Sequence, residues 1–336
     1  MGFRSHTNDK IYTDVYSVFI SGNDVYAVGS LCTDGSSLTD VPTLWINGVA
    51  QTIGNMGNFN RATSVFVEKN DIYIAISEKD SIPNNQDEDE DDYIDLGFED
   101  IDISGSDETP ELNYDPKAIL WKNGVRQLMW NGVAECVYVS DKDVYVVGEM
   151  DQAPVLWNNG NLQVLASNGS ALSVIVHGDD VYVAGYLGSI FNGEAVLWKN
   201  GEMSYLGKGL ARSVYIANNG DVYVAGTINM NNAALWKNGV LIWSEQTYVS
   251  DAYSMTITDN GKIIIGGNAY ISGWDAVVWV DGTRYDFDDK IKYQVSSVVA
   301  DGDNIYVGGD GKGDLWPVWK YEEKSGYNAD NLKRVK

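Results

Sequence analysis

Short apolar segments alternate along the chain with turns made of Gly, Asn and Asp. The clearest segment is A-V-L-W-K-N-G at residues 195–201, where an apolar stretch ending in Trp198 and Lys199 runs directly into Asn200 and Gly201. Asn-Gly favours a two-residue type I′ turn, because both central residues of that turn need a positive φ. We therefore expect a strand, a tight turn and a returning strand here.

This unit recurs along the chain. Related segments occupy residues 43–48, 118–124, 154–160, 233–239 and 276–282, and a degraded copy without the glycine lies at 316–320. A second block precedes each of them. Its clearest copy is A-R-S-V-Y-I-A-N-N-G-D-V-Y-V-A-G at 211–226, and the others lie at 15–29, 62–77, 134–148, 171–185, 252–267 and 295–309. Each block has the composition of two strands around a short turn, so each repeat predicts four strands.

Repeats of this length with four strands are typical of β-propeller blades. Trp157, Trp198, Trp236 and Trp279 follow one another at intervals of 41, 38 and 43 residues. An open stack would need capping repeats, and no distinct capping sequence is visible, so a closed ring is favoured. We predict an all-β, seven-bladed β-propeller with four antiparallel strands per blade, forming one domain over residues 1–336.

The predicted blades span residues 13–57, 58–130, 131–166, 167–207, 208–247, 248–290 and 291–327. The degraded last repeat leaves two sources for the outer strand of the final blade. Either residues 327–336 or residues 3–12 supply it.

Constant residues of the repeat are expected to be structural. The tryptophan of the third strand should fill the wedge between diverging blades, as Trp45, Trp121, Trp157, Trp198, Trp236, Trp279 and Trp319. Small residues recur on the first strand, nearest the axis, where the strands crowd together. The aspartate before the second strand should accept hydrogen bonds from backbone N–H groups of its turn, as Asp24, Asp71, Asp143, Asp180 and Asp221.

One residue between the small ones differs from repeat to repeat. The series is Tyr16, Thr63, Glu135, Leu172, Arg212, Tyr253 and Ser296. These side chains either line the entrance of the central channel or pack between neighbouring inner strands. Tyr16, Glu135, Arg212 and Tyr253 are the candidates for ligand contact among them.

The connections that vary in length and content lead from the second to the third strand and from one repeat to the next. A propeller places both kinds on the same face, and variable loops on a rigid scaffold are typical of recognition. Trp130, Trp243 and Trp274 lie outside the repeat pattern and are candidate ligand-binding residues on this face. Extra core packing is the alternative role of Trp130 and Trp243, whereas Trp274 is expected to be exposed.

Residues 81–116 form an acidic insertion within the second blade, on the same face. The insertion carries fourteen Asp and Glu and neither Lys nor Arg. Apolar residues alternate with acids in its second part, and this pattern favours docking onto a partner through Tyr93, Ile94, Leu96 and Phe98. A solvated surface loop is the alternative. Calcium binding is less favoured, because no spacing matches a calcium-binding loop.

The formal net charge of −25 disfavours binding to nucleic acid and to anionic membranes. No apolar run approaches the ~20 residues that span a membrane.

Cys32 and Cys136 are expected to be free thiols. His6 and His177 are the only histidines, and they can assemble neither a catalytic triad nor a metal site, so we expect no cofactor and no metal. The six arginines are too scattered to predict a cluster that binds an acidic sugar.

The V-Y-V-A-G and L-W-K-N-G blocks resemble repeats of propeller proteins from gut anaerobes, mostly surface or secreted, and from their phages. The resemblance covers about residues 13–320 without the acidic insertion. It implies an extracellular or cell-surface setting, or exposure on a virion, and it implies no particular reaction.

Three functions follow as hypotheses. The first is a non-catalytic recognition module that binds a glycan or protein through the variable face. The second is a structural component of a larger assembly, such as a phage particle, with the acidic insertion as a docking arm. The third and least favoured is a glycoside hydrolase, because such an enzyme needs only two carboxylates.

Overall fold

The computed structural model describes residues 12–32, 40–57, 60–79, 116–271, 273–287, 291, 293–312, 318–321 and 332–335. The secondary structure of these residues is β-strand, without a helix. The strands are β1 (Tyr12–Ser21), β2 (Asp24–Cys32), β3 (Val41–Ile46), β4 (Val49–Thr52), β5 (Arg61–Glu68), β6 (Asp71–Glu78), β7 (Lys117–Lys122), β8 (Val125–Asn131), β9 (Val133–Ser140), β10 (Asp143–Met150), β11 (Ala153–Asn158), β12 (Asn161–Val164), β13 (Ser170–His177), β14 (Asp180–Leu187), β15 (Glu194–Lys199), β16 (Glu202–Ile216), β17 (Val222–Ile228), β18 (Asn232–Lys237), β19 (Val240–Ser244), β20 (Ser250–Ile257), β21 (Ile263–Tyr270), β22 (Trp274–Val280), β23 (Thr283–Asp286), β24 (Val295–Asp301), β25 (Asn304–Lys312), β26 (Val318–Tyr321) and β27 (Leu332–Arg334).

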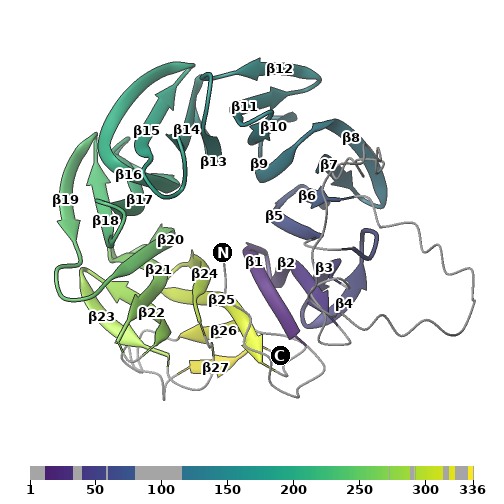
Figure 1. The fold of residues 1–336 in the computed structure, drawn as a ribbon. Helices are drawn as coiled ribbons and strands as arrows, with labels where there is room; N and C mark the ends of the chain where they lie inside the picture. The colour runs from purple at the N-terminus through teal and green to yellow at the C-terminus, as the bar shows by residue number, and fades with distance from the viewer. Residues whose placement is uncertain are drawn as a thin grey trace, which may run out of the picture.

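Successive strands pair antiparallel and form four-stranded groups around a central axis (Figure 1). Each group begins at the axis and ends at the periphery, as in β5–β8, β9–β12 and β20–β23. Strand β16 belongs to two groups, because its first half pairs with β15 and its second half pairs with β17. The molecule is therefore an all-β repeat protein with the architecture of a propeller. Each group is called a blade below and is named by its strands.

Side-chain hydroxyls join the innermost strands of neighbouring blades. Backbone N–H groups donate to serine Oγ atoms of the preceding blade, from Val65 to Ser17 at 3.3 Å, from Val137 to Ser64 at 3.1 Å, from Val214 to Ser173 at 3.2 Å and from Val298 to Ser254 at 3.1 Å. Each bond joins equivalent positions of two adjacent inner strands. The inner strands therefore lie in register around the axis, and we call this set of bonds the seam.

The same bond closes the ring. The N–H of Val18 in β1 donates to Ser297 Oγ in β24 at 3.0 Å, although the two residues lie 279 positions apart. The first residues of β1 also pair with the end of β25. The outer strand of the last blade is β27, which pairs with β26. Of the two sources that the sequence left open, the C-terminal segment thus supplies this strand, and residues 3–11 of the other segment lie outside the described residues.

The repeated tryptophans are buried between blades, which confirms their predicted core role. Trp45 packs in a cluster with Tyr306 and Val318 from the last blade, and Trp198 packs in another with Tyr145 from the preceding one. Both indole rings are fully buried, as are those of Trp236 and Trp279. Burial of such a ring contributes roughly 1.5–3 kcal/mol or more, so these contacts supply much of the packing between blades.

Asparagine side chains fix the Asn-Gly turns. Asn200 has a φ of 52° and Gly201 a φ of 84°, as a type I′ turn requires. The Nδ2 of Asn200 donates to Asp180 at 2.7 Å, and its Oδ1 accepts from the N–H of Val181 at 2.8 Å. The recurrent aspartate is therefore structural, but its donor is the side-chain amide rather than the predicted backbone N–H. The same pair of bonds recurs at Asn47, Asn123, Asn159 and Asn238.

Cys32 and Cys136 are free thiols, as expected. Cys136 takes the place of the seam serine in β9, and burial raises the pKa of its thiol.

None of the described residues belongs to a helix that is long and apolar enough to cross a membrane.

Replacing Ser297 by alanine tests the seam. The Ser297→Ala variant should lose about 1–3 kcal/mol of unfolding free energy, because it leaves the buried N–H of Val18 without an acceptor. Urea unfolding followed by tryptophan fluorescence measures this loss. The neighbouring Ser296→Ala variant is the control: it removes only a half-buried acceptor of the Gln294 side chain and should cost less than Ser297→Ala. Equal losses in the two variants would show that the bond does not hold the ring.

Candidate functional site

A β-bulge interrupts the innermost strand of each blade. The pairing register slips by one residue there and leaves one residue unpaired, and these residues are Tyr16, Thr63, Glu135, Leu172, Arg212, Tyr253 and Ser296. They are the seven variable positions that the sequence analysis selected. A bulge turns a side chain out of the regular alternation of a strand, and bulges are frequent beside functional sites. Because the seam keeps the inner strands in register, all seven bulges lie at one end of the ring.

The glycine of V-Y-V-A-G makes the bulge possible. A Cβ atom at Gly29 would lie 1.7 Å from the carbonyl oxygen of Asp14, and one at Gly226 would lie 2.0 Å from that of Leu210. At these positions the close approach of the two strands leaves no room for a side chain opposite the bulge. This glycine marks each bulge in the sequence, apart from that of the β5–β8 blade, which has Ile76 instead.

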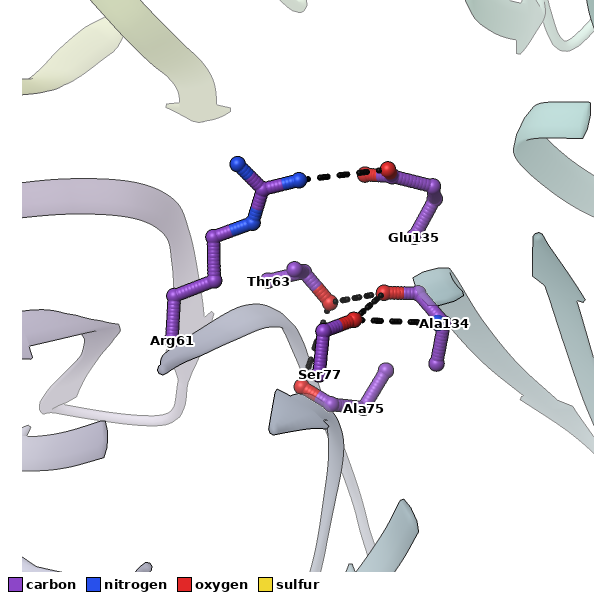
Figure 2. Close-up of polar contacts among 6 residues, drawn as sticks. All are labelled: Arg61, Thr63, Ala75, Ser77, Ala134 and Glu135. Atoms are coloured by element: carbon purple, nitrogen blue, oxygen red, sulfur yellow. Dashed lines mark hydrogen bonds and ion pairs between the residues drawn. The ribbon is translucent and has the colours of Figure 1, made fainter. Parts of the chain in front are cut away.

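In the β5–β8 blade the bulged residue, Thr63, is bonded to the backbone and does not project toward the axis as a free polar group. Thr63 Oγ1 donates to the carbonyl oxygens of Ala134 at 2.9 Å and Ala75 at 3.2 Å, and Ser77 Oγ bonds to the backbone of Ala134 as well (Figure 2). Two residues before Thr63, Arg61 extends toward Glu135 of the next blade, and its Nη2 lies 3.3 Å from Glu135 Oε1 (Figure 2). Arg61 thus provides the polar group of this blade.

Aromatic and charged side chains meet around the axis at the level of the bulges. The Arg61 guanidinium lies over the Tyr16 ring at 5.6 Å, and the Arg212 guanidinium lies over the Tyr253 ring at 4.9 Å. The residues that follow the constant glycine add Glu149, Tyr186, Asn268 and Asp310. We call this set the axial cluster, and it comprises Tyr16, Arg61, Glu135, Glu149, Tyr186, Arg212, Tyr253, Asn268 and Asp310.

Burial, and more weakly the charged members of the axial cluster, shift the pKa values of its tyrosines. Burial raises the pKa of Tyr186 to about 12, with further contributions from the carboxylates of Glu149 and Glu135. Burial also raises the pKa of Tyr253 to about 12, and Asp310 on the next blade adds to this shift while Arg212 opposes it. The pKa of Tyr16 is raised by burial and, more weakly, by the same Asp310. The three tyrosines keep their hydroxyl protons at neutral pH, as a tyrosine of ordinary pKa does, and can act as hydrogen-bond donors.

The two carboxylic acids of the β9–β12 blade differ in environment. Glu135 is ion-paired with Arg61. The pKa of Glu149 is raised by burial and by the charge of Glu135. The described residues hold no group of three or more His, Cys, Asp and Glu side chains placed to bind a metal ion.

The tryptophans chosen from the sequence lie in three different environments. Trp130 is 5% exposed, packs in the core and donates its Nε1–H to the carbonyl oxygen of Glu149 at 3.0 Å. Trp243 is half-buried against the ring of Trp279, with centroids 5.7 Å apart. For these two residues the alternative of core packing applies, and neither belongs to the axial cluster.

Trp274 is 37% exposed and packs edge-to-face on Tyr270, with centroids 5.6 Å apart. The pair lies just beyond Asn268, where β21 ends and β22 begins. Phe191, in the corresponding connection of the β13–β16 blade, is 78% exposed and did not stand out in the sequence. The candidate docking residues Tyr93, Ile94, Leu96 and Phe98 lie outside the described residues.

Five members of the cluster were missed in the sequence, namely Arg61, Glu149, Tyr186, Asn268 and Asp310. Glu149 and Tyr186 directly follow the constant glycine, so variation at that position was a signal that could have found them. Two of the six arginines lie at the axial cluster, Arg61 over Tyr16 and Arg212 over Tyr253, on different blades.

A hollow of about 680 Å³ lies away from this cluster, between the β5–β8 and β9–β12 blades. Tyr73, Lys122 and Asn159 line it, at the end of the blades that carries the Asn-Gly turns. Lys122 is paired with Asp71 at 2.9 Å, and these residues recur in other blades. The hollow is therefore a product of the repeat and is less suited to a specific ligand than the axial cluster.

Neither a family model nor a curated protein sequence matches this chain. Solved structures do match. The WD40 β-propeller domain of Doa1 aligns with a TM-score of 0.52 and 15% identity, over 93% of this chain and 94% of that chain. A puromycin-hydrolysing peptidase of Mycobacterium tuberculosis aligns with a TM-score of 0.56 and 9% identity, over 96% of this chain and 52% of that chain. This chain thus spans about half the length of the peptidase. At such identities the likeness shows the β-propeller fold alone.

Glu149→Gln tests the electrostatics of the cluster. A raised pKa means that the folded state holds the Glu149 proton more tightly than the unfolded chain, in which the pKa is near 4.5. The ionised carboxylate therefore destabilises the fold as the pH rises through the folded pKa. Glu149→Gln should unfold at higher temperature than the wild type at about pH 7.5, and this gain should vanish near pH 4.

The exposed Glu194 provides the control for this experiment, because Glu194→Gln should leave the unfolding temperature nearly unchanged at both pH values. Calorimetric scans of the three proteins at each pH measure the difference. A Glu149→Gln variant that is less stable than the wild type at neutral pH would contradict the assigned environment.

Proposed function

We propose that this chain is a seven-bladed β-propeller that binds a carbohydrate at its axial cluster and catalyses no reaction. Two observations support the number of blades. The continuous strand β16 serves two blades, so that the described strands group by four. Seam bonds join five of the seven successive pairs of inner strands, and the last of them joins Ser297 to Val18.

The composition of the axial cluster is the observation that carries the proposal. A sugar offers many hydroxyl groups, which need donors and acceptors at fixed positions, and apolar C–H faces, which pack on aromatic rings. The cluster supplies both kinds of group, since its tyrosines keep their protons beside guanidinium and carboxylate groups. The bulges vary these groups from blade to blade on an unchanging scaffold.

Aromatic side chains at the same end of the ring extend this surface. Trp274 with Tyr270, and Phe191 two blades away, are exposed where a bound oligosaccharide would extend from the axis. Two aliphatic residues of the same connections, Ile190 and Ile271, are exposed as well, as is Val249 in the connection between β19 and β20. A protein ligand is therefore the alternative, and the fold of the Doa1 domain is compatible with it.

The proposal also includes the location of the binding. We place the binding outside the cell or at the cell surface, supported by the resemblance of the V-Y-V-A-G and L-W-K-N-G repeats to those of surface and secreted propellers. A structural role in a virion is the alternative, in which the acidic insertion would dock onto another subunit.

Hydrolysis of a glycosidic bond is the second candidate function, and the pair of carboxylic acids Glu135 and Glu149 favours it. Glu149 has a raised pKa, as a general acid requires, while its neighbour Glu135 is held beside Arg61. Binding without catalysis remains our proposal, because Glu135 is already engaged in that ion pair.

A glycan array probed with the full chain tests the proposed function, with calorimetry on the glycans retained. Trp274→Ala should weaken the affinity for a retained oligosaccharide by about tenfold, because the variant removes a stacking surface. Tyr205→Ala is the matched control, since Tyr205 is an aromatic residue of 61% exposure on the outer part of β16. Its affinity should equal that of the wild type.

Three outcomes would count against the proposal. Failure to retain any glycan would remove the carbohydrate function, and equal losses in both variants would remove the proposed surface. Release of a shortened sugar by the wild type, but not by Glu149→Gln, would replace binding by hydrolysis.

A further inference from the structure

The two arginines of the axial cluster have the same aromatic support and different charge partners. Both guanidinium groups lie over a tyrosine ring, Arg61 over Tyr16 and Arg212 over Tyr253. The charge of Arg61 is compensated by Glu135 at 3.3 Å. Arg212 forms no ion pair with any of the described residues. One cation of the cluster is thus neutralised by the protein, and the other is not.

The Nε donor of Arg212 is buried and has no acceptor among the described residues. A covered donor without a partner costs about 1–3 kcal/mol, and a native protein retains few such groups. Arg212 as a whole is half-buried, so part of its side chain reaches the axial surface. The fold therefore holds a guanidinium whose charge contacts the Tyr253 ring but is not compensated by a carboxylate of the described residues.

Neighbouring groups hold Arg212 in a defined orientation. The ring of Tyr253 supports one face of the guanidinium, and Asn268 Nδ2 donates to the Tyr253 hydroxyl at 3.4 Å. A guanidinium stacked in this way keeps its edge for hydrogen bonds in the plane, which is the geometry that matches a carboxylate. A hydroxyl group would not compensate the positive charge.

The surrounding acids limit the charge of the partner. Glu149 and Glu135 act on Tyr186 at one side of Arg212, and Asp251 and Asp310 act on Tyr253 at the other. A group with two negative charges would be repelled by these carboxylates. A single carboxylate on an otherwise polyhydroxylated ligand meets less of this repulsion, and its contact with Arg212 can offset it.

We propose that the axial cluster recognises a sugar that carries one carboxylate, such as a uronic acid, and that Arg212 binds this carboxylate. The inference rests on the proposed carbohydrate function. Arg212 and the Tyr253 ring select the acidic residue, and the tyrosine hydroxyls bind the hydroxyl groups of the sugar.

Paired ligands test this specificity on the full chain. Calorimetry compares galactose-terminated with galacturonate-terminated oligosaccharides, and glucose-terminated with glucuronate-terminated ones. The wild type should prefer the acid of a pair by about 10–100-fold, the usual strength of a charge-assisted pair of hydrogen bonds. The methyl ester of the same uronate should lose this preference, and this comparison needs no variant.

Variants then assign the preference to one side chain. Arg212→Gln should bind the acid and the neutral sugar equally, and Arg212→Lys should keep part of the preference. Arg284→Gln is the matched control. Arg284 also lies over a tyrosine, Tyr248 at 4.3 Å, but it is paired with Asp286 on the outer strand β23. This variant should retain the full preference.

The outcomes separate this inference from the proposed function. Equal binding of acid, ester and neutral sugar by the wild type would overturn the inference and leave the carbohydrate function standing. Absence of binding to every sugar would overturn both. Binding of sulfated sugars alone, or of a peptide with a free C-terminal carboxylate but no sugar, would also overturn the inference.

Discussion

The hydrogen bond from a backbone N–H to a serine hydroxyl of the preceding blade is the interaction on which the ring depends. The inner edge of a blade presents N–H groups that no further strand pairs, and unpaired buried donors are costly. A serine one blade away is short enough to fill this gap and offers an acceptor. Because each bond joins equivalent positions, the last of them, between Val18 and Ser297, closes the ring in register.

This seam determines where variation is allowed. The residues that form it must be small, as Ser64 and Ser254 are, so they cannot reach a ligand. The bulge allows both small seam residues and large variable ones. It inserts one residue that takes no part in strand pairing, and it leaves the seam positions unchanged. In six of the seven bulges a glycine opposite makes room for the inserted residue, and the β5–β8 blade has Ile76 there. A repeat can therefore change Tyr16 to Glu135 or Arg212 without changing its core or its contacts with the next blade.

The sequence was sufficient for the parts of the fold that depend on local chemistry. Asn-Gly predicted the type I′ turns, since few other residues accept a positive φ at both positions, and the repeated tryptophans predicted the core between blades. The seven variable residues were found too, but their position on bulges was not, because a bulge is a property of pairing between two strands. The core position of Trp130 could not be predicted, because it depends on a contact between two blades: its indole N–H donates to the carbonyl oxygen of Glu149 in the next blade. Arg61 and Arg212 lie far apart in sequence, and only the ring places both of them at the axial cluster, each over a different tyrosine.

A net charge of −25 makes an uncompensated arginine at the axis informative. The long-range field of such a protein repels anions, although salt screens it beyond about 8–10 Å. An acidic ligand would therefore gain nothing from electrostatic steering, and its affinity would have to come from contacts at short range. The Arg212 guanidinium over the Tyr253 ring is suited to this task, because its orientation is fixed before the ligand arrives. The same field would exclude densely charged polyanions, so a fixed cation within an acidic surface favours ligands whose negative charge is single and well separated from any other.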